Sequence, residues 1–409
     1  MYSNPPARPL KILLLNQTFH PDVMATAHYL TDLALALRER GHVVTVVTSR
    51  RAYDQPDRLF PGKEEWRGIQ IYRVWSSRFG KLAKWRRAAD FATFILSCCW
   101  KLLWMPRQDV TVALTSPPLI SWIAAWFTKI RGGRFCYWIM DMNPDEAIAA
   151  GWLREGSTVA RLLESMSRFS LRTAARIVAL DRFMRDRVLR KGIKAEKISV
   201  ISPWSQDERV HFDPNGREQF RRLHGLQDKF VVMHAGNHSP CHPLDTVLMA
   251  AEKLRDNEQI VFCFQGGGSE FAKVRTVAER QGLRNVLCLP YQPAELLAAS
   301  LSAADLHVVV VGDSFVGTIH PCKIYNALTV GSPIAYVGPS HSHVSDLLQR
   351  STGSSPHIQV RHGEGDLLAQ AILDLNTRRP RLSPEEVTRV GHTCARGVLL
   401  PKMVAATEI

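Results

Sequence analysis

The chain has 409 residues, of which 45% are hydrophobic and 22% are charged. This length exceeds what one ordinary hydrophobic core supports, so it predicts two domains, and the composition excludes a disordered or collagen-like chain. The eight cysteines include no Cys-x-x-Cys pair. They indicate neither a disulfide framework nor a zinc site, and we expect a reducing compartment.

The net charge of +14 is unevenly distributed. Residues 50–109 carry thirteen basic and six acidic side chains, which is half of the total excess. Charge alone attracts nucleic acid and anionic lipid equally well, so the neighbouring residues must decide between them.

The first 50 residues read as one βαβ unit. An apolar run at 11–16 predicts a buried parallel strand, 27–40 an amphipathic helix that Gly41 ends, and 43–48 a second strand. Further strands are expected at 70–74, 110–115, 134–140 and 176–179. The pattern then restarts, with strands expected at 198–201, 229–235, 260–264, 286–289, 306–311 and 334–337.

The predicted fold class is α/β, with two doubly wound, Rossmann-like domains. We expect a first domain at 1–205, a second at 206–383, and a helical tail at 384–409 that packs back on the first domain. Residues 1–9 do not resemble a secretory signal. The longest charge-free run, 110–128, contains a Ser-Pro-Pro sequence and reads as a strand, a turn and a helix start instead of a membrane span.

Loops after the strands of the first half are the first candidates for a site. Residues 16–22 open a helix whose small residues would let a ligand approach, although a capped βα loop explains them equally well. The strand expected at 134–140 delivers Asp141, Asp145 and Glu146 to its carboxyl end. Capping of the next helix explains Asp145 but leaves Asp141 as a functional candidate.

Two loops of the second half carry donors and a cation. In the run His234 to His242, Gly236 permits close backbone approach, while the spacing across Pro240 argues against a metal pair; anion binding and plain turn chemistry stay open. After the strand ending near 311, Pro321 predicts a helix start with Lys323 in its first turn. A lysine there opposes the helix dipole unless an anion is also bound, although a solvated lysine remains an alternative.

Together these motifs resemble the family 4 glycosyltransferases, retaining enzymes of the GT-B fold, in the branch that extends lipid-linked intermediates of bacterial surface polysaccharides. Most of the chain takes part. The matching segments are 11–40, 116–118, 141–144, 235–237, 266–268, 289–293, 303–305 and 321–333.

The resemblance implies two domains facing across a cleft, with the acceptor on the first and a nucleotide-sugar donor on the second. Catalytic roles would fall to Asp141 and Lys323, the latter neutralising the departing diphosphate. The implied donor-binding residues are Gly236, Asn237, His238, Gly267, Tyr291, Gln292, Thr318 and Asn326, and the implied acceptor-side residues are Thr26, His28 and Asp145. No Asp-x-Asp triplet is present, and no metal or other cofactor is expected.

The sequence departs from the family pattern at the donor site. Where the family often has two glutamates eight positions apart, this chain has Thr318 and Asn326, and where it has Arg and Lys after the glycine, this chain has Asn237 and His242. The phosphate site therefore loses fixed charge, which makes Lys323 more important. It also leaves two alternatives open: a nucleotide-sugar epimerase, and an inactive sugar-nucleotide or lipid-binding scaffold.

Residues 81–104 place basic side chains directly before an apolar, tryptophan-rich block. This combination favours an amphipathic element lying in an anionic membrane surface, with a core helix as the alternative. No nucleic-acid-binding motif is present, and no nucleic-acid partner is expected. We therefore expect a peripheral protein on the inner, cytoplasmic face of the bacterial plasma membrane.

Overall fold

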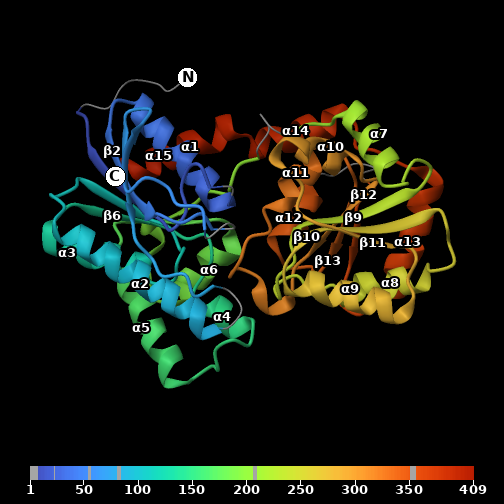
Figure 1. Cartoon of the computed structure of the whole chain (residues 1–409), viewed down its shortest axis with the longest axis horizontal. Helices are drawn as coiled ribbons and strands as arrows, with labels where there is room; N and C mark the ends of the chain where they lie inside the picture. The colour runs from blue at the N-terminus through green and yellow to red at the C-terminus, as the bar shows by residue number, and fades with distance from the viewer. Residues whose placement is uncertain (1–7, 23, 54–56, 81–83, 206–209, 351–355) are drawn as a thin grey trace. The chain divides into compact units, whose positions relative to one another are not determined.

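The structure is a computed structural model that describes residues 8–22, 24–53, 57–80, 84–205, 210–350 and 356–409. The chain forms two compact units, one of Met1–Pro203 with Leu399–Ile409 and one of Trp204–Val398. Each contains a sheet built mainly of parallel strands with helices in the connections, which confirms the α/β class (Figure 1). The eight cysteines all lie in described segments and form no disulfide.

The first unit is built on an eight-stranded sheet in the order β3-β4-β2-β1-β5-β6-β7-β8. All neighbours pair in parallel except β3 and β4. The strands are β1 (Lys11–Leu15), β2 (Val43–Ser49), β3 (Lys63–Trp66), β4 (Ile69–Val74), β5 (Val110–Ala113), β6 (Arg134–Trp138), β7 (Arg176–Ala179) and β8 (Ile198–Val200). The helices are α1 (Ala25–Glu39), α2 (Lys84–Leu103), α3 (Ile120–Arg131), α4 (Asp145–Ala149), α5 (Thr158–Thr173) and α6 (Arg182–Arg190), with a 3₁₀ turn at Ala195–Lys197.

Helices cover both faces of this first sheet, so its central strands can be apolar throughout. Residues Ile12 to Leu15 of β1 are completely buried between them. Helix α3 packs against both α2 and α5, and these three helices lie on one side of the sheet in Figure 1. Helix α1 lies on the other side, together with the C-terminal helix α15 (Arg396–Thr407).

The end of the chain is tied into the first unit by one carboxylate. Glu408 accepts hydrogen bonds from the Arg40 guanidinium at 2.5 and 3.0 Å. It also accepts one at 2.7 Å from Nε2 of His42, whose Nδ1 accepts from the Leu10 amide. The buried His42 ring is thereby held between β1 and the chain end.

The second unit is built on a six-stranded parallel sheet in the order β11-β10-β9-β12-β13-β14. The strands are β9 (Phe230–Asn237), β10 (Ile260–Gly267), β11 (Val286–Leu289), β12 (Leu306–Val310), β13 (Ile334–Val337) and β14 (Ile358–Val360). The helices are α7 (Pro214–Leu223), α8 (Asp245–Lys253), α9 (Ser269–Gln281), α10 (Leu297–Ser302), α11 (Lys323–Thr329), α12 (His343–Arg350), α13 (Gly365–Arg378) and α14 (Pro384–Cys394), with 3₁₀ turns at Ala294–Leu296 and Asp313–Phe315.

Two hydrophobic cores sandwich this second sheet. Helices α8, α9 and α13 pack on one face, around Phe262 and Phe264 of β10. Helices α7 and α10 pack on the other, around Val231 and Met233 of β9. Successive residues of β9 therefore pack into opposite cores, because side chains alternate between the two faces of a strand.

Several predicted boundaries needed correction. Strand β5 ends at Ala113 instead of residue 115, and α11 begins at Lys323, two residues after Pro321. The short strands β3 and β14 were not predicted, because neither has an apolar run of its own and each depends on a neighbouring strand for its pairing. The interpretation of 110–128 as strand, turn and helix start is confirmed by β5 and α3.

Replacing Glu408 with alanine should destabilise the first unit by about 2 kcal/mol, because charge-assisted hydrogen bonds to a half-buried carboxylate contribute about 1.5–3 kcal/mol each. Urea unfolding followed by circular dichroism measures this loss. Glu196→Ala, which removes the exposed partner of Lys194, is the matched control and should cost less than about 1 kcal/mol. Equal losses in the two variants would mean that Glu408 does not anchor the chain end.

Candidate active site

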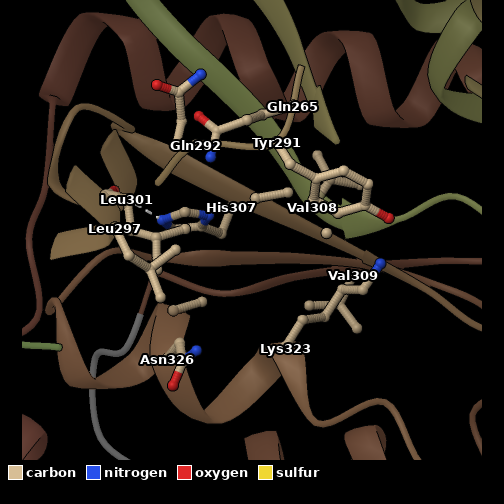
Figure 2. A pocket seen from close by; sticks show the side chains of 13 residues that line it. Gln265, Tyr291, Gln292, Leu297, Leu301, His307, Val308, Val309, Lys323 and Asn326 are labelled. Atoms are coloured by element: carbon tan, nitrogen blue, oxygen red, sulfur yellow. Dashed lines mark hydrogen bonds between the residues drawn. The ribbon is translucent and has the colours of Figure 1, made fainter. Parts of the chain in front are cut away.

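A pocket opens in the second unit where strands β9, β10 and β12 meet helices α10 and α11 (Figure 2). Its volume is about 140 Å³, similar to the ~150 Å³ of an engineered cavity that accepts benzene. It is therefore large enough for one planar ring. The lining residues are Ala235, Gly236, Gln265, Tyr291, Gln292, Leu297, Leu301, His307, Val308, Val309, Lys323, Asn326 and Ala327.

The structure brings four of the predicted donor-binding residues and the predicted catalytic lysine to this one pocket. They are Gly236, Tyr291, Gln292, Lys323 and Asn326. They come from β9, from the loop after β11 and from α11, so the carboxyl ends of neighbouring parallel strands bring them together. Tyr291 is 60% exposed and covers Gly267, to whose carbonyl its hydroxyl donates at 3.4 Å.

Lys323 is held at the pocket edge by neutral partners. Its Nζ donates to Nε2 of His234 at 2.9 Å and to the carbonyl of Asn237 at 3.4 Å. The ring of His234 donates from Nδ1 to the Val308 carbonyl at 3.0 Å, which leaves Nε2 as an acceptor. Within the described segments no carboxylate lies at ion-pair distance from Lys323, so its charge is not neutralised by the protein.

Three histidines surround this lysine as uncharged rings. Burial, followed by the positive charge of Lys323, lowers the pKa of His234 and His242 well below the usual range and lowers the pKa of His238 to about 4. His238 and His242 also donate from Nδ1 to the carbonyls of Gly236 and Val310. Burial lowers the pKa of Lys323 itself to about 8.

The glycines around these rings allow close backbone approach. A Cβ on Gly266 would lie 2.0 Å from the Gly236 carbonyl oxygen, and one on Gly268 would lie 2.4 Å from that of His238. Both residues have positive φ angles of 140° and 128°. Only glycine fits at these two positions. The close packing of the end of β10 against Gly236 and His238 therefore explains the glycines at 266 and 268.

The other predicted donor-binding residues do not line the pocket, although they lie close in the sequence to residues that do. Thr318 is fully buried, and its hydroxyl donates to the Phe315 carbonyl at 2.8 Å. His238 is also fully buried, with an Nε2 atom that has no hydrogen-bond partner among the described residues. Asn237 contributes its carbonyl to Lys323 and places Oδ1 beside Gly268.

Three lining or supporting residues were missed at the sequence level: His234, Gln265 and His307. Gln265 is buried, and its Nε2 donates a hydrogen bond to the Ser300 hydroxyl at 3.3 Å. Its Oε1 has no hydrogen-bond partner among the described residues. His307 bonds the Leu301 carbonyl at 3.0 Å. The available signal was a polar residue inside an otherwise apolar strand, which a buried strand does not carry without a partner or a ligand.

In the first unit, the predicted acceptor-side residues are anchored by local contacts. Thr26 shares a hydrogen bond of 3.0 Å with Thr18, and His28 is half-buried on α1. Asp145 accepts from Lys191 at 2.8 Å and lies 3.8 Å from Arg187. The amide of Asp141 donates to the Thr115 hydroxyl at 3.2 Å.

One carboxyl group in the first turn of α4 has a raised pKa. Burial, reinforced by the charge of Asp141, raises the pKa of Glu146 to about 8. Glu146 is therefore largely protonated at pH 7, and the side-chain amide of Asn143 lies 3.5 Å from its Oε2.

Comparison with known proteins relates this chain to glycosyltransferases. Residues 25–204 match the family model described as glycosyl transferase 4-like domain. The chain contains a glycosyl transferase 4-like domain and is a glycosyltransferase. Among curated relatives, this glycosyltransferase is 25% identical over 391 residues to WcaI of Escherichia coli (strain K12), named for glycosyl transfer in colanic acid biosynthesis, with 89% of this chain and 92% of WcaI covered. It is 21% identical to WbjE of Pseudomonas aeruginosa, named as a glycosyltransferase, with 83% of this chain and 84% of WbjE covered.

Solved structures confirm the GT-B fold of this glycosyltransferase. Anabaena Alr3699/HepE, crystallised with UDP and glucose, superposes with a TM-score of 0.71 at 17% identity and covers 98% of this chain and 99% of its own. WaaG, a glycosyltransferase involved in lipopolysaccharide biosynthesis, has a TM-score of 0.70 at 16% identity, with 97% and 99% covered.

Replacing Glu146 with glutamine should stabilise this glycosyltransferase in a pH-dependent way. Between the ordinary carboxyl pKa of 4.5 and about 8, the folded protein retains a proton that the unfolded chain has lost, so wild-type stability falls as pH rises through this interval. The glutamine variant lacks this titration.

The stability difference between variant and wild type should therefore be near zero at pH 4.5 and grow in favour of the variant up to pH 8. Thermal unfolding across this range measures the difference. A difference that is the same at every pH would show that Glu146 is ionised in the folded protein throughout.

Proposed function

We propose that this glycosyltransferase transfers a sugar from a nucleotide-sugar donor to a membrane-associated, lipid-linked acceptor of bacterial polysaccharide synthesis, with retention of the anomeric configuration. The relatives WcaI and WaaG, whose names refer to colanic acid and lipopolysaccharide biosynthesis, support the pathway class. The neighbour crystallised with UDP-glucose supports a nucleotide-sugar donor.

The observation that carries this proposal is the un-neutralised ammonium group of Lys323 beside a ring-sized pocket. In the proposed complex the base enters the pocket against Tyr291 and meets the unpaired Oε1 of Gln265. The diphosphate then lies over Gly236, where a Cβ would have open space except for Lys323 at 3.9 Å. The third N–H of Lys323, which neither His234 nor Asn237 accepts, points to this anion.

In the proposed reaction the sugar–diphosphate bond breaks while negative charge accumulates on the leaving oxygen. Lys323 stabilises that charge, and because His234 already fixes its position, little reorganisation is needed. The acceptor hydroxyl attacks the anomeric carbon from the face that the diphosphate leaves and passes its proton to the departing phosphate oxygen, which gives retention without a protein nucleophile. Lys323 carries the charge of the leaving group in this scheme, so the proposal includes no resident metal ion.

The acceptor side of the proposal rests on α2. The exposed side chains of α2 include Leu96, Trp100 and Leu103, and Trp104 follows directly after the helix; each of the four is at least 59% exposed. The guanidinium groups of Arg86 and Arg87 lie over aromatic rings at the start of the same helix. Basic groups beside exposed tryptophans suit an anionic bilayer surface. Among the described residues, no helix is long and apolar enough to cross a bilayer.

Replacing Lys323 with alanine should reduce transfer by about 10²- to 10³-fold in kcat, the range found when one group that stabilises a developing oxyanion is removed. The measurement is release of nucleoside diphosphate with UDP-, GDP- and ADP-sugars, in membrane extract and with donor alone. Lys253→Ala, which removes an exposed lysine of α8 paired with Asp366, is the matched control and should retain full activity. Wild-type turnover by the Lys323 variant would refute the phosphate assignment.

Replacing both Trp100 and Trp104 with serine should weaken binding to vesicles that contain anionic phospholipid by at least about tenfold, because two exposed rings would no longer be buried in lipid. Vesicle sedimentation measures the binding. The Leu223→Ser/Met249→Ser pair, which removes exposed apolar side chains from the second unit, is the control. Unchanged vesicle binding by the tryptophan variant would mean that α2 does not contact the membrane.

A further inference from the structure

A second and larger cavity lies within the first unit, whereas the donor pocket belongs to the second. It is a groove of about 710 Å³ lined by α5, the end of α6 and residues 145–156. Ligand sites of this size accept whole small molecules. Six basic and three acidic side chains line it, so its net charge is +3. We refer to it as the cationic groove.

Two acidic side chains at the bottom of the cationic groove form ion pairs with basic side chains of the same unit. Lys191 is only 7% exposed and donates to Asp145 at 2.8 Å and to Glu164 at 2.5 Å. Glu164 also accepts from Nε of Arg168 at 2.7 Å. These contacts fix the floor as a neutral network and explain why Asp145 and Lys191 lie together.

The rim of the cationic groove carries charge that the protein does not use. The guanidinium groups of Arg161, Arg172 and Arg190 are exposed, and within the described segments they have neither an ion pair nor a hydrogen bond. Arg161 and Arg172 stand on one face of α5 with Ser165 and Arg168 between them, at spacings of four, three and four residues. Unpaired arginines converging on one groove are the usual means of binding phosphate groups.

The same groove continues into apolar surface. Phe169 forms part of its wall and stacks on Trp126 of α3, with ring centroids 4.9 Å apart. Trp126 is 42% exposed, and Ile130 on the same helix and Leu162 on α5 are 72% and 61% exposed. Helix α3 also packs against α2, which carries the proposed membrane contact. A ligand that fits this surface has an anionic head and an apolar chain.

We propose that the cationic groove binds the phosphate-bearing head of the lipid-linked acceptor, with the lipid chain lying against α3. This inference rests on the proposed function, because it assigns a place to the acceptor of that reaction. It requires nothing of the donor pocket, so the two can be tested separately. The phosphate would be held by Arg161, Arg172 and Arg190, above the floor that Lys191 closes.

The test is a binding measurement on the full chain with a polyprenyl diphosphate carried in nanodiscs of neutral phospholipid. The Arg172→Glu/Arg190→Glu variant should bind these nanodiscs at least about tenfold more weakly than wild type, because two charge-assisted contacts are lost. Its affinity for UDP should be unchanged. The Arg172→Lys/Arg190→Lys variant, which keeps both charges, should recover part of the binding.

The matched control is Arg185→Glu/Lys194→Glu, which changes the net charge of the first unit equally at exposed positions outside the groove. Wild-type binding by the Arg172/Arg190 reversal, or an equal loss in this control, would overturn the proposal. Competition by inorganic pyrophosphate at the same concentration as the lipid would overturn the lipid part, since a free anion would then suffice. Lys323→Ala should bind the nanodiscs as wild type does, whatever its activity.

Discussion

The donor site depends on a lysine that is positioned without being neutralised. A carboxylate partner would hold Lys323 equally firmly but would cancel its charge. This chain instead uses the Nε2 atom of a buried histidine, whose own Nδ1 is fixed by the Val308 carbonyl. The cost is a lowered lysine pKa, and the advantage is a full positive charge available to an arriving anion. Asn237 and His242 stand where the family that this chain resembles has arginine and lysine. This difference is compatible with the arrangement, because both residues supply neutral atoms around Lys323.

The sequence predicted the architecture well because the strands of a doubly wound sheet are buried on both faces and therefore read as apolar runs. Strands β7, β11 and β13 have the predicted bounds. Strand β3 escaped prediction because its residues Lys63–Trp66 are polar at three of four positions and pair only through β4. Pairing of this kind is a property of the neighbouring strand and is not encoded in the segment itself.

The site was predictable only in part, for a similar reason. Gly236 lies at the end of β9, Tyr291 and Gln292 lie in the loop after β11, and Lys323 and Asn326 lie in the first turn of α11. At such strand ends, loops and helix starts the residue types are informative by themselves. Gln265 and His307 lie within strands, and their function depends on which helix covers them. The pairing of Lys191 with Asp145 and Glu164 joins residues 27 and 46 positions apart. No local sequence pattern shows that this pairing leaves Arg161, Arg172 and Arg190 without ion-pair partners among the residues that the structure describes.

The return of α15 to the first unit makes that unit discontinuous in the chain. Its sheet is complete after β8. Arg40 and His42, however, can form their hydrogen bonds to Glu408 only when residue 408 has been synthesised. During synthesis, the last segment of the second unit therefore emerges from the ribosome before the last segment of the first unit. A chain that stops anywhere between Pro203 and Glu408 would leave the same polar groups of the first unit uncovered, so a fragment that lacks only the segment around Glu408 should be as exposed to cellular proteolysis at this point as a much shorter one.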